Sequence, residues 1–229
     1  MHLPRKVGTC AYCGNVQGIT RDHIPPRNLF PKPRSSDLIT VPCCEACRDG
    51  WSDDDEYFRL HAISARVANN PSAQKICTQI ESSLKKAKKK GFANMLLNNF
   101  CEVPIHSQGG IYLGHADALR IDEKRISRVM SRIVKGLFYE ELGKYLPPTH
   151  ESRGHICDDG FPDPLLKLLE RIDYTGFSAI RTIQGGIFEY TYQALEEDCD
   201  TTLWLGSLYE KLSFFGVTRR LTHTPNAES

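Results

Sequence analysis

The chain has 229 residues, of which 40% are hydrophobic and 25% are charged, and its formal net charge is +1. This composition is typical of a soluble globular protein and not of a disordered one. No apolar run approaches the roughly 20 residues that span a bilayer, and no apolar segment of a secretory signal follows the first residues. We therefore expect a cytoplasmic protein that does not associate with membranes.

The cysteines are concentrated near the N-terminus, where five of the nine lie within the first 47 residues. Cys10 and Cys13 form one Cys-x-x-Cys pair, and Cys44 and Cys47 form a second pair about 30 residues later. Two such pairs predict a tetrahedral zinc site, and four thiolate ligands leave no open position, so the zinc is expected to be structural. Cys43 is an alternative to Cys44, but it lacks the two-residue gap before Cys47.

The segments between and after these pairs predict two short strands and a helix. The first strand covers residues 18–20 and leads to Asp22-His23, and the second covers residues 38–41. A Pro- and Ser-rich loop over residues 28–37 separates the two strands. A helix is expected from Ser52 to about Val67, with acidic residues in its first turn.

This pattern resembles the HNH (ββα-metal) endonuclease family. The residues that match are Cys10-x-x-Cys13, Asp22-His23-Ile24-Pro25-Pro26, a strand ending at Val41, Cys44-x-x-Cys47 and a following helix. The resemblance covers about a quarter of the chain. It implies a nuclease module over residues 1–60 that hydrolyses phosphodiester bonds of DNA, in a defence or mobile-element setting, followed by residues 61–229 as a domain of unknown role.

The resemblance also implies roles for the two residues at the end of the first strand. His23 would act as general base, since a neutral imidazole can take a proton from water near pH 7. Asp22 would hold a catalytic Mg²⁺ or Mn²⁺ ion, because hard cations prefer carboxylate oxygens. Such a cation would stabilise the negative charge that develops on the phosphate.

The sequence departs from the family immediately after the last cysteine. HNH proteins usually carry a metal-ligating Asn or His there or on the next helix, whereas this chain has Arg48, which cannot bind a cation. We expect Asp54 to serve as the replacement ligand, with Asp53 or Asp55 as alternatives. Alternatively, these acids only stabilise the first turn of the helix through its dipole and bind no metal.

Basic residues around the predicted site suggest contact with phosphates. Those expected to bind nucleic acid are Arg21, Arg27, Arg34 and Arg48. A second basic group, the lysine-rich run over residues 85–90, either binds a nucleic-acid backbone or only solvates the end of a helix.

The remaining residues predict a mixed helical and antiparallel β domain, so the overall class is α+β. Glu123–Leu142 has the clearest helical pattern, with a continuous apolar stripe. Helices are also expected over 72–90, 92–100 and 165–171, a loop over 147–164, and strands over 111–113, 116–121, 178–183, 188–195 and 201–217.

Two other functions fit the same residues. The N-terminal module could bind nucleic acid through its zinc-stapled fold without any catalysis, which the presence of Arg48 favours. Alternatively, the chain could be a nuclease subunit that is active only as a homodimer or with a partner protein bound to residues 61–229. DNA remains the expected partner in each case.

Overall fold

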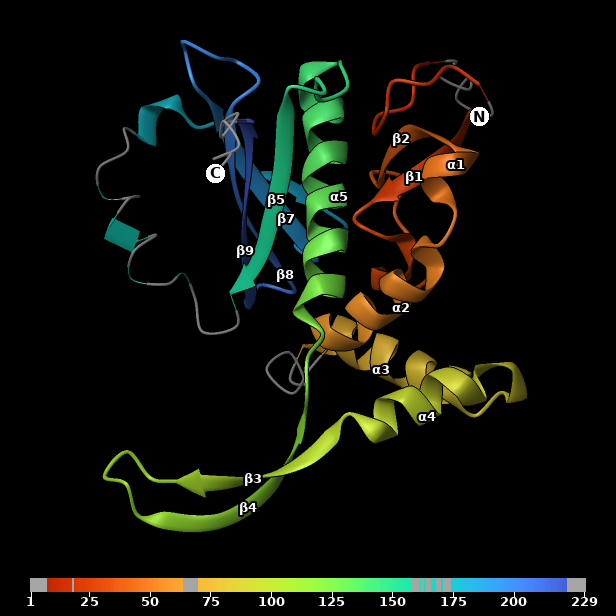
Figure 1. Cartoon of the computed structure of the whole chain (residues 1–229), viewed down its shortest axis with the longest axis vertical. Coiled ribbons are helices and arrows are strands. Elements are labelled where there is room, and N and C mark those ends of the chain that lie inside the picture. Colours follow the sequence, from red (N-terminus) through yellow and green to blue (C-terminus); the bar gives the residue numbers. More distant parts are fainter. Residues whose placement is uncertain are drawn as a thin grey trace, which may run out of the picture.

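A computed structural model describes residues 8–17, 19–63, 70–157, 161, 163, 166–167, 170 and 174–221. The long helix α5 (Glu123–Leu142) stands between an antiparallel sheet on one side and the N-terminal hairpin on the other (Figure 1). This arrangement confirms the expected α+β class. None of the helices in the described residues combines the length and the apolar content that a membrane span requires.

The N-terminal module has the expected order of two strands and a helix. Strands β1 (Ile19–Ile24) and β2 (Ile39–Cys44) pair antiparallel without a break in register. The short helix α1 (Glu45–Arg48) and then α2 (Trp51–Ala62) follow. Helix α2 begins one residue earlier than predicted, after Gly50, whose φ of +83° allows the sharp turn. The predicted extension of this helix to Val67 falls on residues outside the described ranges.

The single helix predicted over 72–90 is instead divided into separate pieces. Helix α3 covers Pro71–Leu84, a 3-10 turn covers Ala87–Lys89, and α4 covers Lys90–Asn98. The break coincides with the lysine-rich run, where neighbouring like charges disfavour a continuous helix. Lys89 turns back to form an ion pair with Glu56 on α2.

A two-stranded hairpin then projects away from the body of the protein (Figure 1). Its strands are β3 (Phe100–His106), which was not predicted, and β4 (Tyr112–Leu119). Hydrophobic side chains near its turn are exposed, including those of Ile111 and Leu113. The hairpin therefore contributes little to the core.

Helix α5 has the predicted bounds. The Asp122 side chain accepts hydrogen bonds from the backbone N–H groups of Lys124 and Arg125, which caps the first turn. Gly143 ends the helix with a φ of +70°. The apolar stripe is buried from Ile126 to Phe138, and Leu142 at the end of the helix is partly buried.

The large sheet has the order β5-β9-β8-β7-β6, and every neighbouring pair is antiparallel. Its strands are β5 (His150–Cys157), β6 (Arg181–Ile183), β7 (Phe188–Ala194), β8 (Thr202–Leu208) and β9 (Leu212–Arg220). The loop predicted over 147–164 was thus wrong, because β5 occupies its first half. The short helix predicted over 165–171 falls largely outside the described residues.

Two glycines explain how α5 lies so close to this sheet. Gly154 on β5 pairs with Gly216 on β9. A Cβ atom at Gly154 would lie 2.9 Å from Met130, and one at Gly216 would lie 2.3 Å from Val134, both on α5. The absence of side chains at this pair is what permits the close packing.

The strand predicted over 201–217 is a hairpin of β8 and β9. Its turn contains Tyr209 and Glu210, whose φ angles are +53° and +65°, as in the turns that suit two-residue hairpins. The buried Tyr209 hydroxyl donates to the backbone carbonyl of Leu29 in the N-terminal module. That tertiary contact holds two non-glycine residues in a conformation they rarely adopt.

Helix α5 joins the two halves of the chain through one continuous set of buried side chains. Ile24 at the end of β1 packs directly against Gly136, where an added Cβ atom would lie 2.4 Å from Ile24 Cγ1. The opposite face of the helix covers the sheet. Residues 8–60 therefore share their core with the remainder of the described chain.

Candidate metal centre and nucleic-acid site

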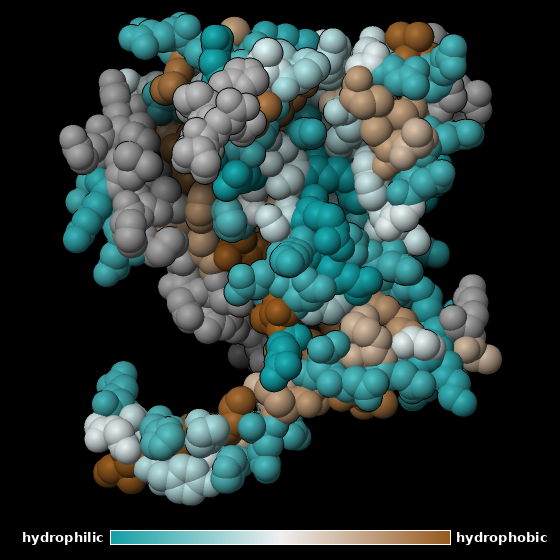
Figure 2. Space-filling view, viewed as in Figure 1, coloured by the Kyte–Doolittle hydropathy of each residue, from teal (hydrophilic) through white to brown (hydrophobic). Residues whose placement is uncertain are grey.

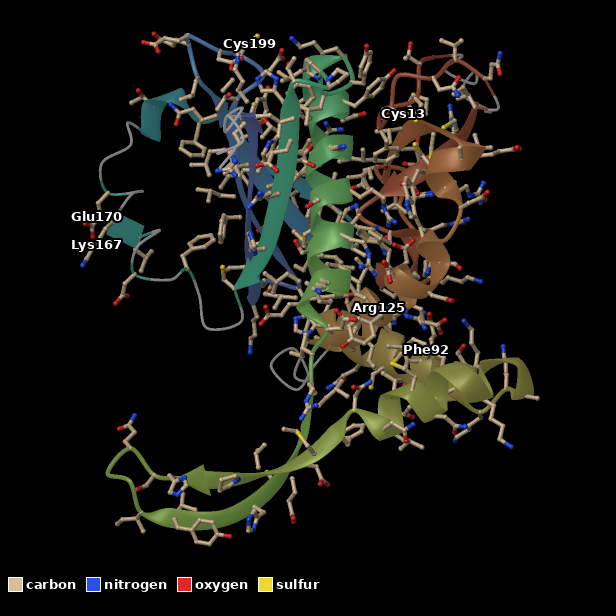
Figure 3. The ribbon with its side chains drawn as sticks, viewed as in Figure 1. Cys13, Phe92, Arg125, Lys167, Glu170 and Cys199 are labelled. Carbon is tan, nitrogen blue, oxygen red and sulfur yellow. The ribbon has the colours of Figure 1, made fainter. Side chains whose placement is uncertain are left out.

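The four predicted zinc ligands come together at one end of the hairpin. The Sγ atoms of Cys10, Cys13, Cys44 and Cys47 all lie within 4.8 Å of one another, and Cys13 Sγ is 3.6 Å from Cys44 Sγ. Ligands of a tetrahedral Zn–S site with bonds of about 2.3 Å would be about 3.8 Å apart. The cluster fits a structural zinc ion, and Figure 3 shows Cys13 beside α1 at this end of the module.

Cys43 is not a member of this cluster. Its thiol is buried and donates a hydrogen bond to the backbone carbonyl of Cys44 at 3.3 Å. Burial and the nearby negative charge of Asp22 raise the pKa of Cys43, so it remains a thiol. Adjacent residues on β2 point to opposite faces, and therefore only Cys44 reaches the first cysteine pair.

His23 lies on β1 opposite Thr40, surrounded by three of the predicted arginines. Burial of the ring lowers the pKa of His23 below its ordinary value of 6.5, and the charges of Arg27, Arg34 and Arg21 lower it further, against the opposing effect of Asp22. The imidazole is consequently neutral near pH 7, which is the form a general base requires.

The basic residues around His23 form a compact group on this face of the hairpin. Arg27 begins a 3-10 turn (Arg27–Leu29), and its backbone carbonyl accepts a hydrogen bond from Arg34 Nε at 3.2 Å. Arg48 lies apart, exposed at the end of α1 near the zinc cluster. The structure therefore brings together Arg21, Arg27 and Arg34, but not Arg48.

Asp22 occupies the other face of the strand, because the pairing of β1 with β2 is regular at both positions. One of its carboxylate oxygens accepts a hydrogen bond from the Tyr12 hydroxyl at 2.5 Å. The same oxygen lies 3.8 Å from Arg132 Nε on α5. Burial, followed by the charge of Asp22, raises the pKa of Tyr12 well above its ordinary value.

Asp55 is the helical acid that approaches Asp22. Its carboxylate forms an ion pair with Arg132, so that this guanidinium contacts Asp55 and lies close to Asp22. Burial raises the pKa of Asp55 although Arg132 acts in the opposite direction. The loop before β2 is tied to the same place, because Asn28 Nδ2 donates to the Asp55 carbonyl at 3.0 Å.

Asp54, the predicted second metal ligand, faces a different group of charges. Its carboxylate is 2.8 Å from Arg128 Nε and 3.1 Å from Arg125 Nε, both on α5. Figure 3 shows Arg125 where α5 meets the helices of the N-terminal half. Asp53, the other alternative, is exposed.

Arg132 is the site residue that sequence reasoning missed. Its side chain is only 6% exposed, and its guanidinium stacks over the Trp51 ring at 4.3 Å. Nothing in the sequence marked this arginine, because it lies within the apolar stretch of α5. A divalent cation bound by Asp22 and Asp55 would have to take the place of this guanidinium, and in the described residues only the four cysteines form a group of three or more metal-binding side chains.

Comparison of the chain with models of protein families, with curated proteins and with solved structures finds no match.

Proposed function

We propose that the chain is a metal-dependent endonuclease of the HNH type, which hydrolyses phosphodiester bonds of DNA. The observation that carries this proposal is the arrangement of the N-terminal module. Four cysteines cluster where a hairpin meets a helical segment. The first strand carries Asp22 and His23, and α2 brings Asp55 toward Asp22.

In this proposal His23 accepts a proton from the water that attacks the phosphorus atom, while the 3′ oxygen leaves. The neutral ring is suited to that step, and Arg21, Arg27 and Arg34 around it provide positive charge for the phosphates. Asp22 with Asp55 would hold Mg²⁺ or Mn²⁺, which supplies electrostatic stabilisation of the phosphate charge when it is bound. Asp54 is a less suitable ligand, because two arginines already occupy its carboxylate.

A second candidate is a nucleic-acid-binding module that does not cut. Two observations favour it. Arg132 already neutralises the carboxylates that would hold the catalytic cation, and Asp22 and His23 project from opposite faces of a regular strand. On this view the arginines around His23 contact phosphates, and His23 has no chemical role.

The experiment that separates these functions uses supercoiled plasmid. The full chain is incubated with Mg²⁺ or Mn²⁺, or with EDTA, beside the His23→Ala variant, and zinc content is measured for both proteins. Metal-dependent nicking that His23→Ala lacks, with zinc retained, supports the nuclease. DNA retardation without cutting in any metal supports the binding module, and cutting that persists in His23→Ala contradicts the role of this residue.

A further inference from the structure

A cleft of about 810 Å³ lies between the zinc-stapled module and α5. One wall contains Tyr12, Cys47 and Trp51 of the module, and the other contains side chains of α5 and β5. Arg132 lines it as well, so the cleft reaches the charged group around Asp22. Hydrophilic side chains dominate the surface in this region (Figure 2).

The α5 wall of the cleft is basic. Lys124, Arg128 and Lys135 all line it, and their spacing of four and seven residues places them on one face of the helix. The two lysine side chains form no ion pair with any other described residue, whereas Arg128 contacts Asp54. Free ammonium groups in a row along a helix are suited to a linear polyanion.

The acidic residues of the cleft do little to offset these charges. Asp49 and Glu151 are the acids that line it. Glu151 is already paired, with one carboxylate oxygen 2.6 Å from Arg219 Nη2 and the other 3.2 Å from Arg153 Nη2. The unpaired charge of the cleft is therefore positive.

The polar groups and the length of the cleft match a nucleic-acid backbone. The side chains of Ser127 and Ser131 lie between the basic residues on the same wall and can donate hydrogen bonds to phosphate oxygens. Lys124 and Lys135 are separated by about 16 Å along the helix axis at 1.5 Å per residue. That distance corresponds to about five nucleotides of one strand in duplex DNA.

We propose that this cleft binds the phosphodiester backbone of a nucleic acid through Lys124, Arg128 and Lys135 of α5. The contact lies outside the residues that resemble HNH proteins and adds a second anchoring surface to the module. The inference rests on the proposed action on nucleic acid, but it holds equally for the cutting and the non-cutting forms of that proposal.

The test compares two double variants that each remove two positive charges from the full chain. Lys124→Gln with Lys135→Gln alters the cleft, and Lys85→Gln with Lys86→Gln alters the exposed lysine-rich run. Glutamine keeps the helical preference of lysine on α5, and Lys85 and Lys86 are exposed outside the helices, so both variants are expected to fold. Binding of a short labelled DNA duplex, and of its single strand, is measured in EDTA at several KCl concentrations.

We expect the cleft variant to bind at least about tenfold more weakly at 0.1 M salt. The slope of log affinity against log salt should fall by about 1.8 for the duplex and about 1.4 for the single strand. The Lys85/Lys86 variant should match wild type. If wild type binds and the cleft variant matches it, or if both variants lose affinity equally, the inference is overturned while the action on nucleic acid stands. If wild type binds neither DNA probe, the proposed function fails with it.

Discussion

Arg132 on α5 forms an ion pair with Asp55 on α2, across the boundary between the N-terminal module and the rest of the chain. Its guanidinium also lies 3.8 Å from Asp22. The guanidinium of Arg132 therefore occupies the space between Asp22 and Asp55, the two carboxylates to which the proposed function assigns the divalent cation. If a divalent cation binds between Asp22 and Asp55, as we propose, this arginine has to move away.

Replacement of Arg132 by alanine should destabilise the protein by about 3 kcal/mol, because it leaves the partly buried carboxylates of Asp22 and Asp55 without their buried counter-charge. Urea unfolding followed by circular dichroism measures the loss. Arg128→Ala is the matched control, since that side chain is 59% exposed and pairs with Asp54 at the surface; its effect should stay below about 1 kcal/mol. Equal effects of the two variants would contradict a structural role of the buried pair.

One zinc ion per chain should be found by native mass spectrometry. Cys44→Ser should lose this ion and destabilise the N-terminal module, because a structural zinc ion contributes folding free energy to the segment that holds it. Cys43→Ser should retain the ion, since its thiol points away from the cluster. Zinc loss in Cys43→Ser with retention in Cys44→Ser would reverse the assignment.

Among the acids of α2, Asp55 should matter more for cutting than Asp54. In the plasmid assay, Asp55→Asn should lower the nicking rate by at least about tenfold, as expected for a residue that positions or binds the catalytic ion. Asp54→Asn should stay close to the wild-type rate, because its carboxylate is held by Arg125 and Arg128. A larger loss in Asp54→Asn would instead make that residue the metal ligand.

Gly136→Ala should destabilise the protein by about 1–3 kcal/mol, the usual range for overpacking. The new Cβ atom would lie 2.4 Å from Cγ1 of Ile24, which is buried, and 2.5 Å from its Cδ1. Gly91→Ala is the control, because this glycine lies in the first turn of α4 with open space around it, and alanine there should leave the stability unchanged or raise it by less than about 1 kcal/mol. A neutral Gly136→Ala would show that the contact between β1 and α5 is loose.

The sequence predicted those features that depend on the spacing of residues close together in the chain. The two Cys-x-x-Cys pairs predicted the metal cluster, and the apolar stripe of residues 123–142 predicted α5, because both patterns are local. Strand β5 could not be predicted in this way. Its residues are mostly polar, and it is a strand because β9 pairs with it and α5 lies on Gly154.

The candidate site also combines residues that a local pattern identifies with residues that only distant contacts bring together. Asp22 and His23 could be recognised from their place between the cysteine pairs, but their partners come from elsewhere in the chain. Arg132 follows Asp22 by 110 positions, and Tyr209, which holds an unusual turn, is fixed by its contact with Leu29. Contacts over such separations leave no periodic pattern in a single sequence.

The close packing of Ile24 on Gly136 has a consequence for any attempt to transplant this module. A fragment cut after residue 60 would expose the Ile24 side of the hairpin and would carry Asp22 and Asp55 without the arginine that neutralises them. Any unit moved to another scaffold would therefore need α5 as well as the hairpin and α2. The segment that carries the motif is therefore shorter than the segment that keeps these side chains covered and their charges neutralised.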